Sequence, residues 1–339
     1  MLKDETAGDP VSGLKWTRKT TAKIAAELEY MGIKVSPRTV AKILKEMGFS
    51  LRANQKKLSR CSVSPQVRNE QFVYIAEQRQ HFADQGAIVI SIDTKKKEMV
   101  GNFKNDGQVW TRDAAAVDDH DFRSQAKGVA IPYGIYDVLA NVGSVFIGTS
   151  YDTAEFAVDC LVMWYVYEGR LRYPNAKEIL LLADSGGSNG STRRAWKYWL
   201  QVKFCNVFGL KVTVCHYPPG TSKWNLIEHR LFSQISKNWA GRPLVSYETV
   251  LNYISTTTTK TGLKVSSYLN IAKYEKGQKI SDKQMKELAL TRHTVQPKQN
   301  YTLAPQSVVL ERQNEVSCQR TGGSNAELLS EQNREVIFA

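Results

Sequence analysis

Three acidic residues occupy positions from which they could act together on a phosphorus centre. Asp93 ends the apolar run 87–92, and Asp184 ends a second apolar run at 179–183. Glu228 lies one turn into an amphipathic segment that starts near Trp224. Two strands and one helix can therefore present three carboxylates to one point, as a two-metal site for cleavage or transfer of a phosphodiester requires.

The metal ions expected at this point are Mg²⁺ or Mn²⁺, in a pair. Both ions prefer oxygen ligands, and Mg²⁺ takes only a few of them from the protein. We expect Asp93 to bridge two ions and Asp184 and Glu228 to bind one each. Two such ions, roughly 4 Å apart, activate an attacking oxygen and stabilise a leaving oxygen.

Each acidic residue also has an ordinary structural interpretation. An aspartate at a strand end often caps a turn, and a glutamate on an exposed helix, as Glu228 would be, often only pairs with a nearby Arg or Lys. The loop before Glu228 favours a functional site, because it is rigid at Pro218 and Pro219 and places Lys223 near the carboxylate. Lys223 would hold a DNA phosphate or stabilise the loop, and Asn225 would orient DNA or cap the helix.

Two further segments near these residues have alternative interpretations. The loop 186–190 follows Asp184 and lacks the Gly-Lys-Ser/Thr of a P-loop, so no nucleotide cofactor is expected. Its small residues would let a DNA backbone approach, or they form an ordinary strand-to-helix turn. In the acidic cluster 118–121 we favour a role in the loop's own hydrogen bonding, with His120 and Asp121 as auxiliary candidates at the site.

The distribution of charge indicates a polyanionic partner. The net charge is +13, and residues 1–70 hold 14 Lys and Arg against 7 Asp and Glu. Such a basic end favours nucleic acid through phosphate contacts. The apolar runs are too short for a membrane span and no signal segment opens the chain, so we expect a cytoplasmic, nucleoid-associated protein without a membrane partner. The five cysteines form no C-x-x-C pair, which argues against a zinc site.

Residues 17–49 have the pattern of two short helices. Ile24, Leu28 and Met31 share one face of the first, and Ser36 precedes Pro37 at the start of the second. The second helix carries a basic row, which with the following linker supplies the residues expected to contact DNA: Arg38, Lys42, Lys45, Lys56 and Lys57. A helix-turn-helix that enters the major groove explains this pattern, as does a helical hairpin with a solvated basic face.

The later part of the chain alternates strands and helices. Strands are expected at 87–93, 98–103, 144–150, 178–184 and 210–215, with the first two forming an antiparallel hairpin and 104–138 an insert. This order predicts an α/β fold of the RNase H-like type, a mixed five-stranded sheet flanked by helices. In that topology Asp93 and Asp184 end neighbouring strands.

Four regions follow from these patterns. We expect a small all-α helix-turn-helix domain at 1–50, a basic linker and helix at 51–86, the RNase H-like domain at 87–302, and a polar, disordered tail at 303–339.

Several motifs together resemble the DDE transposases of the Azo-thirteen insertion-sequence family, over about residues 8–303. The motifs are Ile92–Glu98, His120–Phe122, Pro132–Asp137, Ala183–Gly190 and Cys215–Phe232. The resemblance implies an RNase H-like domain, divalent metal, and action on the element's own DNA ends, with the acidic triad at Asp93, Asp184 and Glu228.

The resemblance leaves three functions open. A transposase would bind terminal repeats, cut them and join the 3′-OH to target DNA, as a homo-oligomer that holds two ends together. A nuclease of the same fold would cut without joining. Relatives begin further upstream, and the chain after Thr302 differs from the family's usual close, so an inactive DNA-binding remnant is the third interpretation.

Overall fold

The computed structural model describes part of the chain, which divides into two compact units with a boundary after Arg60. The described residues are 7–8, 15–16, 19–51 and 63–306. The predicted contacts at Lys56 and Lys57, and most of the predicted tail, lie outside them. In this part of the chain no helix is long and apolar enough to cross a lipid bilayer.

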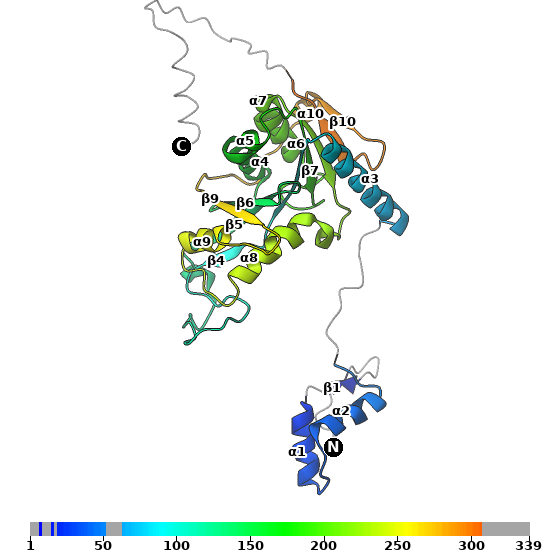
Figure 1. Ribbon diagram of the computed structural model, residues 1–339, viewed down its shortest axis with the longest axis vertical. Coiled ribbons are helices and arrows are strands. Elements are labelled where there is room, and N and C mark those ends of the chain that lie inside the picture. The colour runs from blue at the N-terminus through cyan, green and yellow to red at the C-terminus, as the bar shows by residue number, and fades with distance from the viewer. Residues whose placement is uncertain (1–6, 9–14, 17–18, 52–62, 307–339) are drawn as a thin grey trace, which may run out of the picture. The chain divides into compact units, whose positions relative to one another are not determined.

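The first unit contains the two predicted helices, α1 (Thr21–Tyr30) and α2 (Pro37–Glu46) (Figure 1). The hydroxyl of Ser36 accepts a hydrogen bond from the backbone of Thr39 at 3.1 Å, so Ser36 is the predicted N-cap of α2. The helices bury Ile24, Ala25 and Val40 between them. A short strand pair, β1 (Ala7–Gly8) with β2 (Lys15–Trp16), completes the described part of this unit.

The second unit is built on a mixed sheet of nine strands in the described part of the chain, with the order β10-β11-β8-β7-β3-β5-β6-β9 and β4 paired to β5. The strands are β3 (Ile88–Thr94), β4 (Glu98–Val100), β5 (Gly128–Asp137), β6 (Val142–Gly148), β7 (Glu178–Ala183), β8 (Lys211–His216), β9 (Lys264–Asn270), β10 (Leu290–Arg292) and β11 (Asn300–Leu303). The mixed α/β class is as predicted. The sheet is wider than the five strands expected, because β9, β10 and β11 extend it at both edges.

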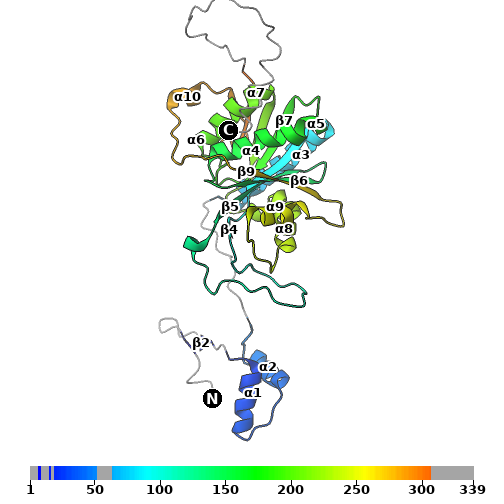
Figure 2. The ribbon, with the colours of Figure 1, turned by 90° about the vertical axis from the view of Figure 1, so that its left-hand side faces the viewer.

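Helices cover both faces of this sheet (Figures 1 and 2). The α-helices are α3 (Pro65–Asp84), α4 (Ala154–Trp164), α5 (Arg170–Arg172), α6 (Arg194–Trp199), α7 (Asn206–Phe208), α8 (Ser233–Asn238), α9 (Tyr247–Ser255) and α10 (Asp282–Lys286). Helices α4 and α6 pack on one face, whereas α3, α8 and α9 pack on the other. Figure 2 shows α4 and α6 across the sheet from α8 and α9.

The predicted hairpin between the first two strands is wrong. Strand β3 pairs with β5, antiparallel, and the short β4 also pairs with β5. The predicted insert therefore contains a central strand of the sheet. Its sequence includes Gly128, Pro132 and Gly134, which are unfavourable in strand interiors. Burial of residues 130–137 on both sides overrides that local preference.

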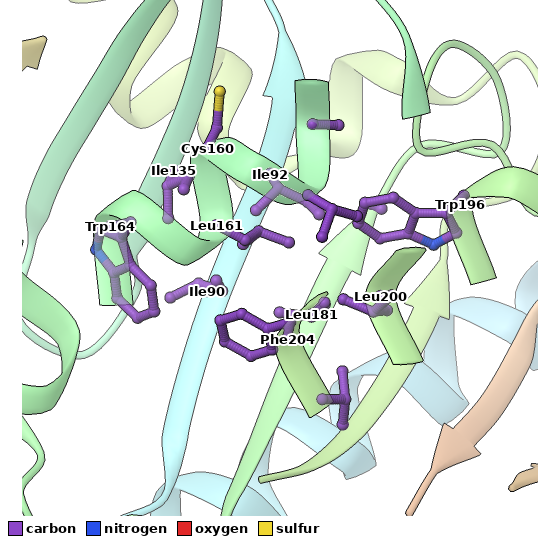
Figure 3. Packing of buried hydrophobic residues seen from close by; sticks show 14 of the residues in the cluster. Ile90, Ile92, Ile135, Cys160, Leu161, Trp164, Leu181, Trp196, Leu200 and Phe204 are labelled. Atoms are coloured by element: carbon purple, nitrogen blue, oxygen red, sulfur yellow. The ribbon is translucent and has the colours of Figure 1, made fainter. Parts of the chain in front are cut away.

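The alternation of β3 divides its side chains between the two faces. Ile88, Ile90 and Ile92 join the cluster under α4 and α6, where Trp164, Trp196 and Phe204 are also buried (Figure 3). Val89 points to the opposite face and packs with residues of α3. Helices cover both faces of the central strands, and this packing fixes the positions of the strand ends.

The helical segment that carries Glu228 packs closely against two glycines of the sheet. A Cβ atom at Gly134 would stand 2.4 Å from Phe232, and one at Gly143 would stand 2.4 Å from Leu231. Phe232 and Leu231 are both buried against the sheet. The two glycines therefore let this segment approach β5 and β6 closely.

We expect Gly134→Ala to lower the free energy of unfolding by about 1–3 kcal/mol, because its methyl group overpacks this contact. Chemical denaturation would measure the change. Gly186→Ala is the matched control, since a Cβ there meets nothing within 4 Å and the change should be small. If both variants were as stable as the parent protein, the close contact between Gly134 and Phe232 would be contradicted.

Candidate active site

Strands β3 and β7 bring two of the three predicted acidic residues to one edge of the sheet. The strands are parallel, with Ile92 opposite Ala183 as their last pair. Asp93 follows Ile92 and Asp184 follows Ala183, so the carboxylates leave neighbouring strands at the same level. The carboxyl ends of parallel strands are the usual place for a site in such sheets. The predicted adjacency of these two strands is confirmed.

Glu228 reaches the same place from the helical segment after β8. The segment begins with the π-helical stretch η5 (Glu228–Phe232) and continues as α8. Ile227 and Leu231 are buried, which orients Glu228 away from the core. All three carboxylates line one open pocket of about 580 Å³. The residues that line it are Asp93, Thr94, Lys95, Lys96, Lys97, Asp152, Asp184, Gly186, Gly187 and Glu228.

Burial disfavours the charged form of each of the three carboxylates. Burial raises the pKa of Asp93 to about 8, and the negative charges of Asp184 and Glu228 add to the shift. Burial likewise raises the pKa of Asp184 to about 6, although the hydrogen bond from Asn225 opposes the shift. The pKa of Glu228 is also raised by burial, against the charges of Lys95 and His229. Burial is thus the largest cause of all three shifts, and repulsion between carboxylates adds to it at Asp93 and Asp184.

The chemistry of this donor set fits a divalent cation. Carboxylate oxygens are the ligands that Mg²⁺ and Mn²⁺ prefer, and a cation would stabilise the charged forms that burial disfavours at all three residues. As the side chains stand, no three acidic, histidine or cysteine residues within the described ranges converge closely enough to enclose an ion. The carboxylates line the wall of a pocket and do not form a closed cage.

Asn225 holds Asp184 from inside the protein. Its side chain is fully buried, and its amide donates to Asp184 Oδ1 at 3.2 Å. Its carbonyl oxygen accepts from the hydroxyl of Ser91 on β3 at 2.5 Å, and that hydroxyl accepts from the backbone of Ile227 at 3.2 Å. The network ties β3, β7 and the Glu228 segment together. In this structure Asn225 contacts a candidate catalytic carboxylate, and not an open surface as a direct DNA contact would require.

We expect Asn225→Ala to lower the free energy of unfolding by about 1–3 kcal/mol, because it leaves the buried Ser91 hydroxyl without its acceptor. Ser91→Ala should cost less, and the double variant should show a coupling of about 0.5–3 kcal/mol. Urea denaturation of the four proteins gives this cycle. Strictly additive effects would contradict a shared network.

A fourth carboxylate and three lysines complete the pocket. Asp152 accepts a hydrogen bond from the hydroxyl of Thr94 at 3.2 Å and pairs with Lys97 at 3.4 Å. Lys95 pairs with Glu98 at 3.1 Å and lies 4.4 Å above the ring of Trp239. Asp152 is not among the residues predicted for the site, and its neighbour Thr153 caps α4. The signal for its role was its place just after strand β6, which runs parallel to β3.

Other residues predicted for the site lie elsewhere. Lys223 is exposed, with its ammonium group 4.1 Å above the ring of Trp224, and it does not line the pocket. His120 stacks on Phe122 and pairs with Asp119, so neither it nor Asp121 is brought to the carboxylates.

The predicted DNA-contacting residues of α2 lie on its exposed side. Arg38, Lys42 and Lys45 are all exposed to solvent. Lys42 makes an ion pair with Glu46 at 3.9 Å, which is too exposed to fix its position.

Comparison with solved structures gives distant similarities to transposases. A Mos1 transposase paired-end complex with the left transposon end matches with a TM-score of 0.42 and 15% identity, over 69% of this chain and 65% of that chain. A Mos1 mariner paired-end complex with Mn has a TM-score of 0.40 and 16% identity over 69% and 65%. The corresponding complex with Mg has a TM-score of 0.39 and 15% identity over 73% of each chain. The present chain thus spans about two thirds of the length of these proteins.

No curated protein matches the sequence significantly. The sequence model of one family, described as the Rhodopirellula transposase DDE domain, matches residues 1–305. That match covers most of the chain, including all three candidate carboxylates. The chain therefore belongs to this family of DDE transposases.

Proposed function

We propose that this chain is an insertion-sequence transposase that cuts DNA at the ends of its element and joins the freed 3′-OH to target DNA. The observation that carries the proposal is the set of three carboxylates, Asp93, Asp184 and Glu228, which come from separate elements and line one pocket. DDE transposases use divalent metal, and these residues would hold two Mg²⁺ or Mn²⁺ ions. The ions would supply charge stabilisation at the attacking and leaving oxygens.

The proposed reaction has two steps at phosphorus. In the first, a water oxygen bonds to the phosphorus at the element end, and the bond between phosphorus and the 3′-oxygen breaks to leave a 3′-OH. In the second, that 3′-OH attacks a phosphorus of the target, whose own 3′-oxygen leaves. Asn225 keeps Asp184 in place during both steps, and Lys95 supplies positive charge beside Glu228.

DNA is the proposed partner for both units. In the first unit, Arg38, Lys42 and Lys45 of α2 would contact the terminal repeats, as part of a helix-turn-helix domain. Holding two ends together calls for a homo-oligomer on DNA. Action on chromosomal DNA would place the protein in the cytoplasm, at the nucleoid.

The test is a cleavage and joining assay on labelled DNA that carries the element's ends, with Mg²⁺ or Mn²⁺. Metal-dependent joined products support the proposal. Cleavage without joined products would identify a nuclease, and DNA binding without any cleavage would identify an inactive remnant.

We expect Lys45→Ala to weaken DNA binding to a similar extent on all sequences and to reduce the salt slope of the logarithm of affinity by about 1, because one phosphate contact is lost. Fluorescence anisotropy at several salt concentrations would measure both. Lys237→Ala, on α8, is the control. An unchanged slope in Lys45→Ala would contradict a phosphate contact at this residue.

A further inference from the structure

The loop directly after Asp184 forms one wall of the pocket with backbone alone. Gly186 and Gly187 line the pocket and are exposed. A Cβ atom at Gly186 would meet nothing within 4 Å, and Gly187 has a φ of +75°, in the left-handed region that favours glycine. Backbone N–H groups of such turns can point together into a concave anion site.

The hydrogen-bond donors of this loop lack partners. The backbone N–H groups of Gly186, Gly187, Ser188 and Asn189 donate to no acceptor within the described ranges. Asn189 is 1% exposed, yet neither its amide nitrogen nor its carbonyl oxygen has a partner, and the same is true of the Ser188 hydroxyl. A buried amide without partners is costly, so a ligand that supplied hydrogen bonds to it would stabilise this loop.

The unpartnered amide lies just behind the glycine wall. Asn189 Oδ1 is 3.7 Å from the position that a Cβ of Gly187 would take. Asn189 does not line the pocket itself, so its amide would reach a ligand on Gly187 only if the loop moves.

A buried positive charge lies beneath the same loop. The ammonium group of Lys197 donates to the carbonyl of Ser191 at 2.6 Å, and Lys197 is 6% exposed. It pairs with no carboxylate within the described ranges, and its other neighbour is the ring of Tyr301 at 5.0 Å. Burial, together with the charge of Arg292, lowers the pKa of Lys197 to about 8. Lys197 therefore places a basic group beside Ser191, two residues after the loop, although the pocket itself is acidic.

We propose that the loop Gly186–Asn189 is an anion site, which binds a phosphate group of the DNA backbone next to the reacting bond. The backbone N–H groups, the Ser188 hydroxyl and the Asn189 amide are its donors. This inference rests on the proposed function for the identity of the ligand. The site lies in the same pocket as the carboxylates but uses other groups, because it binds a phosphate through hydrogen bonds and needs no metal.

The test measures binding of a labelled DNA duplex by the full chain in EDTA, where no cleavage occurs. Asn189→Asp places a negative charge beside the phosphate, and we expect at least about tenfold weaker binding. Asn189→Ala should weaken binding about threefold to tenfold. Asn252→Asp adds the same charge on the exposed α9, outside the pocket, and should stay within about twofold of the parent protein.

A second arm separates the two sources of phosphate. ¹⁵N NMR would follow the amides of Gly186 and Gly187 during titration with inorganic phosphate. Weaker DNA binding together with shifted amide signals supports a general anion site, whereas weaker DNA binding alone supports a site that only a DNA strand completes. Binding within twofold of the parent in Asn189→Asp and Asn189→Ala, with unshifted amides, would overturn the inference.

Two controls protect these conclusions. Thermal unfolding shows whether each variant is folded, and Ser188→Ala replaces Asn189→Asp if the latter is not. Because the measurement contains no metal, a protein that fails to cut or join DNA can still show the anion site. Conversely, unchanged binding in the variants would leave the proposed transposase activity standing.

Discussion

Replacing Asp184 with asparagine is expected to lower metal-dependent DNA cleavage and joining by a factor on the order of a thousand or more. The variant keeps the shape of the side chain and an oxygen that can accept from Asn225. It loses the charge that would hold a divalent cation, and with it the stabilisation of the reacting oxygens. Initial rates on labelled DNA ends, with Mg²⁺ in excess, would measure the loss.

The same variant should bind DNA in EDTA at least as well as the parent protein, because one negative charge is gone from the pocket. Asp282→Asn, an exposed aspartate of α10 that pairs with Arg194, is the matched control and should cleave normally. Cleavage by Asp184→Asn within tenfold of the parent would show that Asp184 has no part in the chemistry.

The metal-free protein is expected to lose stability as the pH rises from about 4 to about 8. Asp93 has a pKa of about 8 in the folded protein against 3.8 for a free side chain. Folding therefore favours the protonated form of Asp93. The stability that this form contributes is fully present below pH 3.8, the pKa of a free side chain, and is lost as the pH rises through about 8, the pKa in the folded protein. Asp184, whose pKa is raised to about 6, acts in the same direction.

Asp93→Asn should remove much of this pH dependence and raise the free energy of unfolding at pH 8 in EDTA by about 2 kcal/mol. Mg²⁺ should stabilise the parent protein at pH 8, and the variant much less, because ligand binding to the folded state adds stability. Denaturant unfolding from pH 4 to pH 8, with and without Mg²⁺, measures both. A parent protein whose stability rises over this range would contradict the crowding of charge at Asp93.

The strand ends could be predicted because their signals are local. The runs before Asp93 and Asp184 are apolar except for Ser91, as expected for strands buried on both faces, and an acidic residue follows each run. Their adjacency followed from the order of strands and helices. The pairing of β3 could not be predicted from local signals, because its partner β5 contains Pro132 and Gly134. This segment is a strand only through its burial in the sheet.

Contacts between residues that are far apart in the sequence could not be predicted from local patterns. Asn225 and Ser91 are 134 positions apart, and nothing in either segment shows that they share a hydrogen bond. The same holds for Asp152 and Lys97, which meet only because β6 and β3 end at the same edge of the sheet. Local patterns place side chains on elements, but the packing of the sheet decides which of them meet.

The most direct measurement is anomalous diffraction at the manganese absorption edge, from crystals of the protein with Mn²⁺ and a DNA end. We expect anomalous peaks within ligand distance of the carboxylates of Asp93, Asp184 and Glu228, with Asp93 contacting both ions of the pair. Well-ordered manganese bound elsewhere, with these three side chains free of metal, would contradict their assignment as the metal ligands.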